Sequence, residues 1–200
     1  MKNVFLIFIF SLSFFKGQTI TIDIRDSELN QPDGYYSKDI SNLLDSFVGT
    51  YLYTNGNTSF KIVLEKKVKQ YNGRYYEDLI IGEYQYIVNG VEKINTLSQL
   101  NTVYSNQNRH KISGNHIITN NNTRLWKCPQ CAPNEKRLGL GILDAATQRS
   151  AMIFMRRTTV NGQQVMQVKI GNVNSVTWAS GQPEPLEFSL PKGEFTMIKQ

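Results

Sequence analysis

The chain has 200 residues, and its 22 Lys and Arg against 16 Asp and Glu give a formal net charge of +6 at pH 7. This length fits one ordinary domain. The basic surplus is small and spread along the chain. This excludes nucleic acid as a partner, because nucleic-acid sites need a concentrated basic face with a recognisable motif.

The N-terminal segment has the layout of a secretory signal peptide. A lysine precedes an apolar run over residues 4–15, and Gly17 supplies a small residue before the cleavage point. The run is too short to span a bilayer, which requires about 20 apolar residues. We therefore predict a signal peptide over 1–17, one mature domain over 18–200, no membrane span, and export to the periplasm or the extracellular medium. The alternative is a buried N-terminal strand that is never removed.

The first predicted elements are a strand over Thr19–Arg25 and one short helix over Asp39–Phe47. Apolar residues of the second segment recur at the three- and four-residue spacing of a helical face: Ile40, Leu43, Leu44 and Phe47. Asp39 or Ser37 is a suitable N-cap, since a short oxygen-bearing side chain can accept a free N–H of the first turn.

Four Asn-Gly pairs predict hairpin turns. Asn55, Asn72 and Asn89 begin the first three pairs at equal intervals of 17 residues, and Asn161 begins the fourth. The type I′ turn needs positive φ at both central residues, and these two residue types adopt it most easily. The equal spacing predicts strands of similar length that run up and down as a meander.

The segments around these turns alternate between apolar and polar residues, as half-buried strands do. The run Thr58–Val68 shows this alternation, while Tyr75–Val88 is apolar on both faces and predicts a long central strand. Gly82 in its middle predicts a bulge or a bend. Later strands are predicted at Arg109–Thr119, Arg137–Leu143, Ala151–Thr159, Gln163–Ile170 and Glu194–Lys199. Loops are predicted at Thr96–Gln107 and Asn172–Pro191.

This pattern predicts an all-β fold with one short helix. Antiparallel strands must close or stack so that their edges are hidden. The two candidate architectures are therefore a barrel or strongly curved sheet, and a sandwich. The regular hairpins favour the barrel. The helix followed by Phe47–Tyr53 resembles the start of lipocalin-type barrels, where a helical turn leads into a Gly-x-Trp strand, with Tyr51 here in the place of the tryptophan.

A set of short blocks carries a resemblance to a known family. They are the end of the signal segment near Gln18–Ile20, and Val48–Tyr51, Tyr53–Thr58, Tyr71–Asp78, Gly82–Tyr84, Ser113–His116, Cys128 with Cys131, Pro133–Leu138 and Arg156–Thr158. The mature chain resembles a family of uncharacterised secreted proteins from flavobacteria and their relatives. This resemblance implies an exported bacterial protein of one domain. It implies no activity, because the family is known as a domain of unknown function.

Cys128 and Cys131 are the two cysteines of the chain, and their spacing suits three chemistries. A catalytic redox pair needs a helix N-terminus that stabilises the first thiolate, whereas a strand-like segment follows Cys131, so redox catalysis is disfavoured. A local disulfide suits an exported chain and is the favoured interpretation. Zinc is the alternative, since His110 and His116 together with the two cysteines would complete a tetrahedral site.

No other motif in the sequence supports a catalytic centre or a cofactor. The chain has no Gly-rich phosphate loop, no nucleophile elbow and no His-Glu-x-x-His. Glu77 and Asp78 fall on opposite faces of a strand, so they are not predicted to act as an acid–base pair. Arg156 and Arg157 also fall on opposite faces. One of them could point inward and meet a ligand carboxylate, although an end-of-strand position in solvent is favoured.

The sequence therefore favours an exported, non-enzymatic binding protein of the cell envelope or the medium. Its partner would be a small apolar ligand or another envelope component. Two alternatives remain open at this point: a structural or adhesive envelope component, and an enzyme with an unrecognised site.

Overall fold

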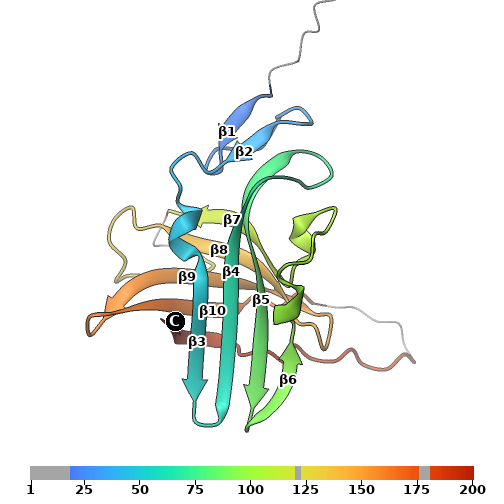
Figure 1. Ribbon diagram of the computed structural model, residues 1–200, viewed down its shortest axis with the longest axis vertical. Coiled ribbons are helices and arrows are strands. Elements are labelled where there is room, and N and C mark those ends of the chain that lie inside the picture. Colours follow the sequence, from blue (N-terminus) through green and yellow to red (C-terminus); the bar gives the residue numbers. More distant parts are fainter. Residues whose placement is uncertain (1–18, 120–122, 176–180) are drawn as a thin grey trace, which may run out of the picture.

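The computed structural model describes residues 19–119, 123–175 and 181–200, so the predicted signal peptide lies outside the described residues. The fold is all-β (Figure 1). None of the helices in these residues is long and apolar enough to cross a membrane.

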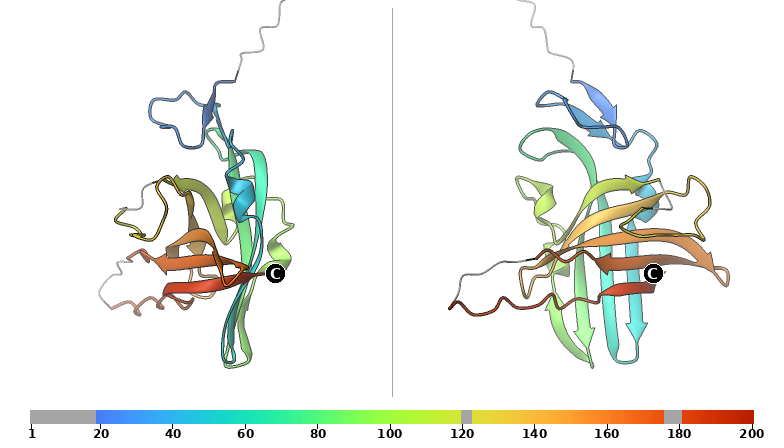
Figure 2. Two further views of the ribbon diagram at one scale, coloured as in Figure 1. Left: turned by 90° about the vertical axis from the view of Figure 1, so that its left-hand side faces the viewer. Right: turned by 180° about the vertical axis from the view of Figure 1, so that it is seen from behind.

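Eight antiparallel strands form a closed up-and-down barrel. They are β3 (Gly49–Asn55), β4 (Thr58–Tyr71), β5 (Tyr76–Val88), β7 (Ile112–Ile118), β8 (Arg137–Leu143), β9 (Ser150–Val160), β10 (Gln163–Gly171) and β11 (Gly193–Lys199). Each strand pairs with the next, and β11 returns to pair with β3. The strands β3 to β5 form one wall, and β8 to β11 cross it at a steep angle (Figure 2). The prediction of a barrel is confirmed, and the alternative of a sandwich is wrong.

Three short strands extend the sheet beyond the barrel. β1 (Thr21–Asp23) and β2 (Tyr36–Lys38) pair in parallel, and β2 pairs in parallel with the start of β5. β6 (Val91–Asn95) pairs with the end of β5. The chain then crosses the outer face through two 3-10 helices, η2 (Leu97–Gln99) and η3 (Gln107–Arg109), before it enters β7.

The predicted helix over Asp39–Phe47 is shorter than expected. Only a 3-10 helix, η1 (Leu44–Phe47), forms. Asn42 has a φ of 52°, in the left-handed region, and this interrupts helical backbone before the second turn can form. Asp39 does act at the start of this turn, because its carboxylate accepts the N–H groups of Leu43 and Leu44 at 2.8 and 2.9 Å.

Two of the four Asn-Gly turns have the predicted geometry. The pairs at 89–90 and 161–162 have positive φ at both residues, as a type I′ turn requires. At Gly56 and Gly73 only the glycine has positive φ, so these two hairpins use other turns.

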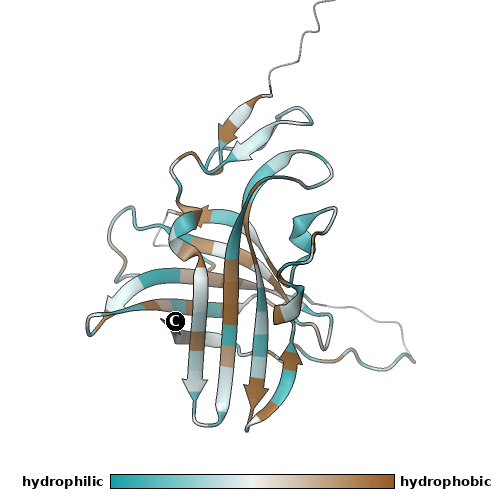
Figure 3. Ribbon diagram, in the orientation of Figure 1, coloured by the Kyte–Doolittle hydropathy of each residue, from teal (hydrophilic) through white to brown (hydrophobic). Residues whose placement is uncertain are grey.

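The core lies inside the barrel. Inward-facing apolar residues of the eight strands form one buried cluster, and alternate residues of β4 such as Phe60, Ile62 and Leu64 belong to it. The middle of β4 is correspondingly apolar in Figure 3. At the end where β3 begins, Leu44 and Phe47 of η1 join this cluster.

At the opposite end, Phe188 and Leu190 from the described part of the connection between β10 and β11, residues 172–175 and 181–192, enter the core. Its described residues have no regular structure, as predicted. Asp144, after β8, fastens this segment, since its Oδ2 accepts the backbone N–H and the hydroxyl of Ser189 at 2.6 and 2.8 Å.

Gly82 does not form the predicted bulge. The register runs through it without a shift, with Leu64 opposite it on β4 and Ile112 opposite it on β7. The glycine serves close packing instead, because a Cβ at this position would lie 2.5 Å from Leu64 Cδ2 and 2.8 Å from the carbonyl oxygen of Val63.

We predict that Gly82→Ala destabilises the barrel by about 1–3 kcal/mol, because the added methyl group overpacks the wall of β4. Gly171→Ala is the matched control, since a Cβ there meets no atom within 4 Å. Urea denaturation followed by tryptophan fluorescence measures both. Equal midpoints for the two variants would contradict the packing role of Gly82.

We predict that Asp144→Asn lowers the stability by about 1–3 kcal/mol at pH 7, because the charged hydrogen bonds to Ser189 are lost. Burial opposes ionisation of Asp144, but the hydrogen bonds from Ser189 and Ala146 outweigh it and lower its pKa. A lowered pKa stabilises the fold above the unfolded value of about 3.9, and this contribution is lost as the pH falls through the folded value. The stability difference between wild type and variant, measured in urea, should therefore be full at pH 7 and shrink below about pH 4. A stability difference that stays constant across this pH range would show that the negative charge of Asp144 does not cause it.

Candidate functional site

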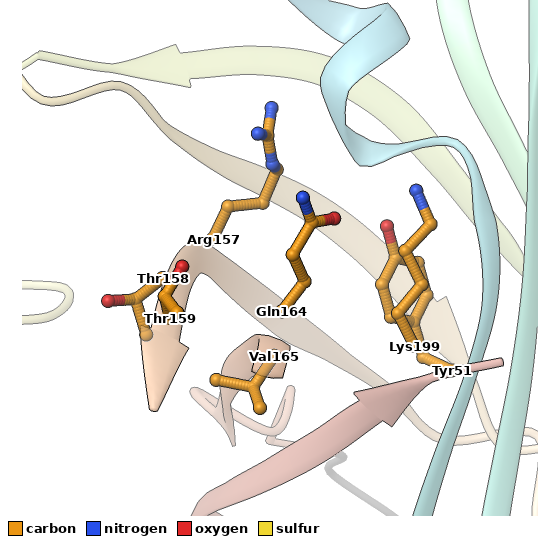
Figure 4. Close-up of a pocket in the computed structure, with 7 residues that line it drawn as sticks. All are labelled: Tyr51, Arg157, Thr158, Thr159, Gln164, Val165 and Lys199. Carbon is orange, nitrogen blue, oxygen red and sulfur yellow. The ribbon is translucent and has the colours of Figure 1, made fainter. Parts of the chain in front are cut away.

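A polar pocket of about 230 Å³ opens at the end of the barrel where β3 begins (Figure 4). We call it the barrel-end pocket. Its lining residues are Tyr51, Arg157, Thr158, Thr159, Gln164, Val165 and Lys199. They come from β3, β9, β10 and β11, which meet because the barrel is closed.

Strand alternation explains why polar side chains converge at this end. Arg157, Gln164 and Lys199 each lie two residues beyond a buried methionine of the same strand, and residues two apart share a face. Tyr51 lies directly opposite Lys199 across the pairing of β3 with β11. The polar ends of Arg157, Gln164 and Lys199 accordingly point to the same side in Figure 4.

A layer of three buried methionines lies behind the residues that line the pocket. Met155, Met166 and Met197 are each 0% exposed and belong to the core cluster. Met166 is the direct cross-strand neighbour of both Arg157 and Met197. The charged end of the barrel therefore rests on unbranched, adaptable apolar side chains.

The two cations of the pocket carry uncompensated charge. Within the part of the chain that the structure describes, neither Arg157 nor Lys199 forms an ion pair with a carboxylate. Gly49, with φ of 139°, leaves room for the lysine, since a Cβ there would lie 3.1 Å from Lys199 Cε.

Tyr51 adds a neutral hydroxyl beside these charges. Burial raises its pKa, and the positive charge of Arg157 only partly opposes this, so the hydroxyl stays protonated at neutral pH. It donates to the carbonyl oxygen of Phe47 at 3.0 Å, which fixes the ring against η1. The oxygen keeps its capacity to accept a hydrogen bond.

This set of groups suits the binding of a small oxyanion. Arginine presents a planar fork of donors, lysine a compact charge, and the amide of Gln164 and the threonine hydroxyls supply neutral donors. None of the seven lining residues is a histidine, cysteine, aspartate or glutamate. Lys199 and Tyr51 are therefore the lining groups that could transfer a proton.

The two neighbouring arginines lie on opposite faces, as predicted. Arg156 points outward and is bound by Glu135, with a distance of 2.6 Å from Nε to Oε1, and by Gln167. Arg157 is exposed at the end of its strand but lies on the inward face of the barrel end. Lys199 and Gln164 were not among the predicted site residues. The alternation of Met166, Val168 and Ile170 already placed Gln164 inward.

Glu77 and Asp78 have separate partners, in agreement with their opposite faces. Glu77 accepts hydrogen bonds from the side-chain amides of Asn72, Asn108 and Asn115, and burial raises its pKa. Asp78 accepts the hydroxyl of Tyr36 at 2.6 Å and the backbone N–H groups of Asp39 and Lys69. Both carboxylates fasten loops to the sheet.

Cys128 and Cys131 form the predicted disulfide. It lies in the segment that follows β7 and packs on the outer face of the barrel, where Trp126 contacts Phe154. The guanidinium of Arg137 lies 5.3 Å from the centre of the Trp126 ring and donates to its carbonyl oxygen at 2.7 Å. The bridge is therefore a local clasp on an outer cover, remote in sequence from the barrel-end residues.

The four residues of the zinc alternative are not brought together. His110 is buried against Glu83, with 2.8 Å between Nδ1 and Oε1, whereas His116 is exposed on β7. Both sulfur atoms are bonded to each other. Among the described residues, no three His, Cys, Asp or Glu side chains gather as a metal site would require.

Comparison with known proteins identifies a family and no activity. The sequence matches, over residues 1–200, a family described as a family of unknown function (DUF6705), and the chain belongs to it. No curated protein and no solved structure matches the chain. The chemistry of the pocket therefore has to be argued from its own residues.

We predict that the double variant Cys128→Ser, Cys131→Ser still folds. Its free energy of unfolding should fall by about 2 kcal/mol, because a bridge around so short a loop restricts the unfolded chain only slightly. Urea denaturation of the variant, and of the wild type with and without a reductant, measures the loss. A variant that is unfolded at room temperature would show that the clasp is required for the fold.

Proposed function

We propose that this member of the family is an exported, non-enzymatic binding protein of the cell envelope or the medium, which holds a small organic anion in the barrel-end pocket. The observation that carries the proposal is the pair of cations, Arg157 and Lys199, on the inward face of a barrel end with no carboxylate partner in the described residues.

The neighbourhood of these cations supports an amphipathic anion with a carboxylate head. The carboxylate of the ligand would lie between the guanidinium of Arg157 and the ammonium group of Lys199, where no carboxylate of the described residues is bound. The ring of Tyr51 and the side chain of Val165, which line the pocket, offer an apolar contact for the body of the ligand, and the methionine layer lies behind them. The interior beyond this layer is occupied by the core, which supports a ligand held at the end of the barrel instead of deep within it.

Export is supported by two independent features. The N-terminal segment has the composition of a signal peptide, and the disulfide suits an oxidising compartment. A binding protein is proposed in place of an enzyme because the lining of the pocket holds no histidine, aspartate or glutamate, the residues that most often act as a general base.

The proposal predicts that hexanoate or benzoate binds to the mature chain, and that Arg157→Gln and Lys199→Gln each weaken the binding by about tenfold, since one charge-assisted hydrogen bond is lost. Isothermal titration calorimetry measures this, with the affinity expected to fall as salt rises.

Lys169→Gln is the matched control. Lys169 lies on β10 like Gln164 but on the outer face, 3.7 Å from Glu194. It should leave the affinity unchanged. If neither probe binds, or if the control weakens binding as much as Arg157→Gln does, the barrel-end pocket is not the site and a structural or adhesive role is favoured.

A further inference from the structure

A second pocket, of about 420 Å³, lies outside the barrel and shares no lining residue with the barrel-end pocket. We call it the outer pocket. It lies between the segment that leads into β7 and the strands β7 to β9, and is lined by Tyr104, Asn108, Arg109, His110, Lys111, Ser113, Gly141, Ile142, Leu143 and Ser150.

Two buried carboxylates of β5 hold one wall of this pocket in place. Glu77 accepts the side-chain amide of Asn108 at 2.7 Å, and Glu83 accepts Nδ1 of His110 at 2.8 Å. Both carboxylates project from the outer face of β5, so the segment around η3 is fixed to the sheet at two points. A wall held in this way needs little ordering when a ligand binds.

Hydrogen bonds at both ring nitrogens fix His110 in this wall. The amide nitrogen of Gln107 donates to the carbonyl oxygen of Tyr104 at 2.8 Å, so its amide oxygen faces Nε2 of His110 at 3.3 Å. On the other side of the ring, Nδ1 lies 2.8 Å from Oε1 of Glu83, which also accepts the N–H of Lys111.

The side chains of Arg109 and Lys111 give this pocket a positive surface. The carboxylate of Glu83 is buried against His110 and forms no ion pair with either of them. No residue that lines the pocket is acidic, and in the described parts of the chain neither Arg109 nor Lys111 forms an ion pair. The guanidinium of Arg109 is held at 5.4 Å from the centre of the Tyr104 ring.

The geometry points to a second anion site in the outer pocket, for a phosphate group. Arg109 offers forked donors, Lys111 a point charge, and Ser113 and Ser150 hydroxyl groups around the same space. Two cations with several neutral donors match a doubly charged, tetrahedral oxyanion better than a single carboxylate. The same chemistry serves free inorganic phosphate and a phosphate ester, whose organic part would meet the ring of Tyr104.

Two double variants of the full mature chain test this site, with each pocket serving as the control for the other. Inorganic phosphate and phenyl phosphate are titrated by calorimetry into the wild type, Arg109→Gln with Lys111→Gln, and Arg157→Gln with Lys199→Gln. Arg109, Arg157 and Lys199 are exposed and Lys111 is half-buried, and circular dichroism checks the fold of both variants.

The first double variant should lose at least about tenfold in affinity for phosphate, and the second should bind it as the wild type does. Tighter binding of phenyl phosphate than of inorganic phosphate identifies an ester as the ligand, and equal affinities identify the free ion. The proposal is overturned if the wild type binds neither probe at millimolar concentration, or if the Arg109 and Lys111 variant binds them unchanged. Binding lost only in the Arg157 and Lys199 variant would assign phosphate to the barrel-end pocket and also overturn it.

Discussion

Closure of the sheet through β11 and β3 is the constraint on which the other features of the molecule depend. The connection is short: Ile198 pairs with Leu52, Lys199 pairs with Tyr51, and the N–H of Gln200 donates to the carbonyl oxygen of Thr50. Without it, both strands would expose unpaired backbone groups as free edges. The same connection places the last residues of the chain beside the first barrel strand, and so creates the barrel-end pocket.

The filling of the barrel determines where a ligand can be held. A barrel of eight strands has an interior just wide enough for side chains or one small ligand. Here apolar side chains fill it up to the layer of Met155, Met166 and Met197, and polar residues begin in the next layer. Unpaired cations deeper in the barrel would be strongly destabilising. At the boundary they remain hydrated until a ligand covers them, and their attraction for its charge then strengthens as water is excluded.

The sequence predicted most of the fold because the signals were local. Alternating or continuous runs of apolar residues located seven of the eight barrel strands to within about three residues, and Asn-Gly pairs located four of the turns. The prediction failed where tertiary contacts decide. The turn at Asn42 shortened the helix, and close packing against Leu64 explains Gly82 better than a bulge does. The pairing of β11 with β3 joins distant segments and has no local signal.

The candidate sites were harder to predict because a cation in a sequence does not reveal its partner. Arg156 and Arg157 are neighbours, yet Glu135 neutralises the first and no described carboxylate reaches the second. In the outer pocket, Glu83 is buried against His110 and forms no ion pair with Arg109 or Lys111. In both places the nearby carboxylate has a different partner. Net charge therefore says little about anion binding in this protein, and the allocation of carboxylates among cations decides which surfaces attract a ligand.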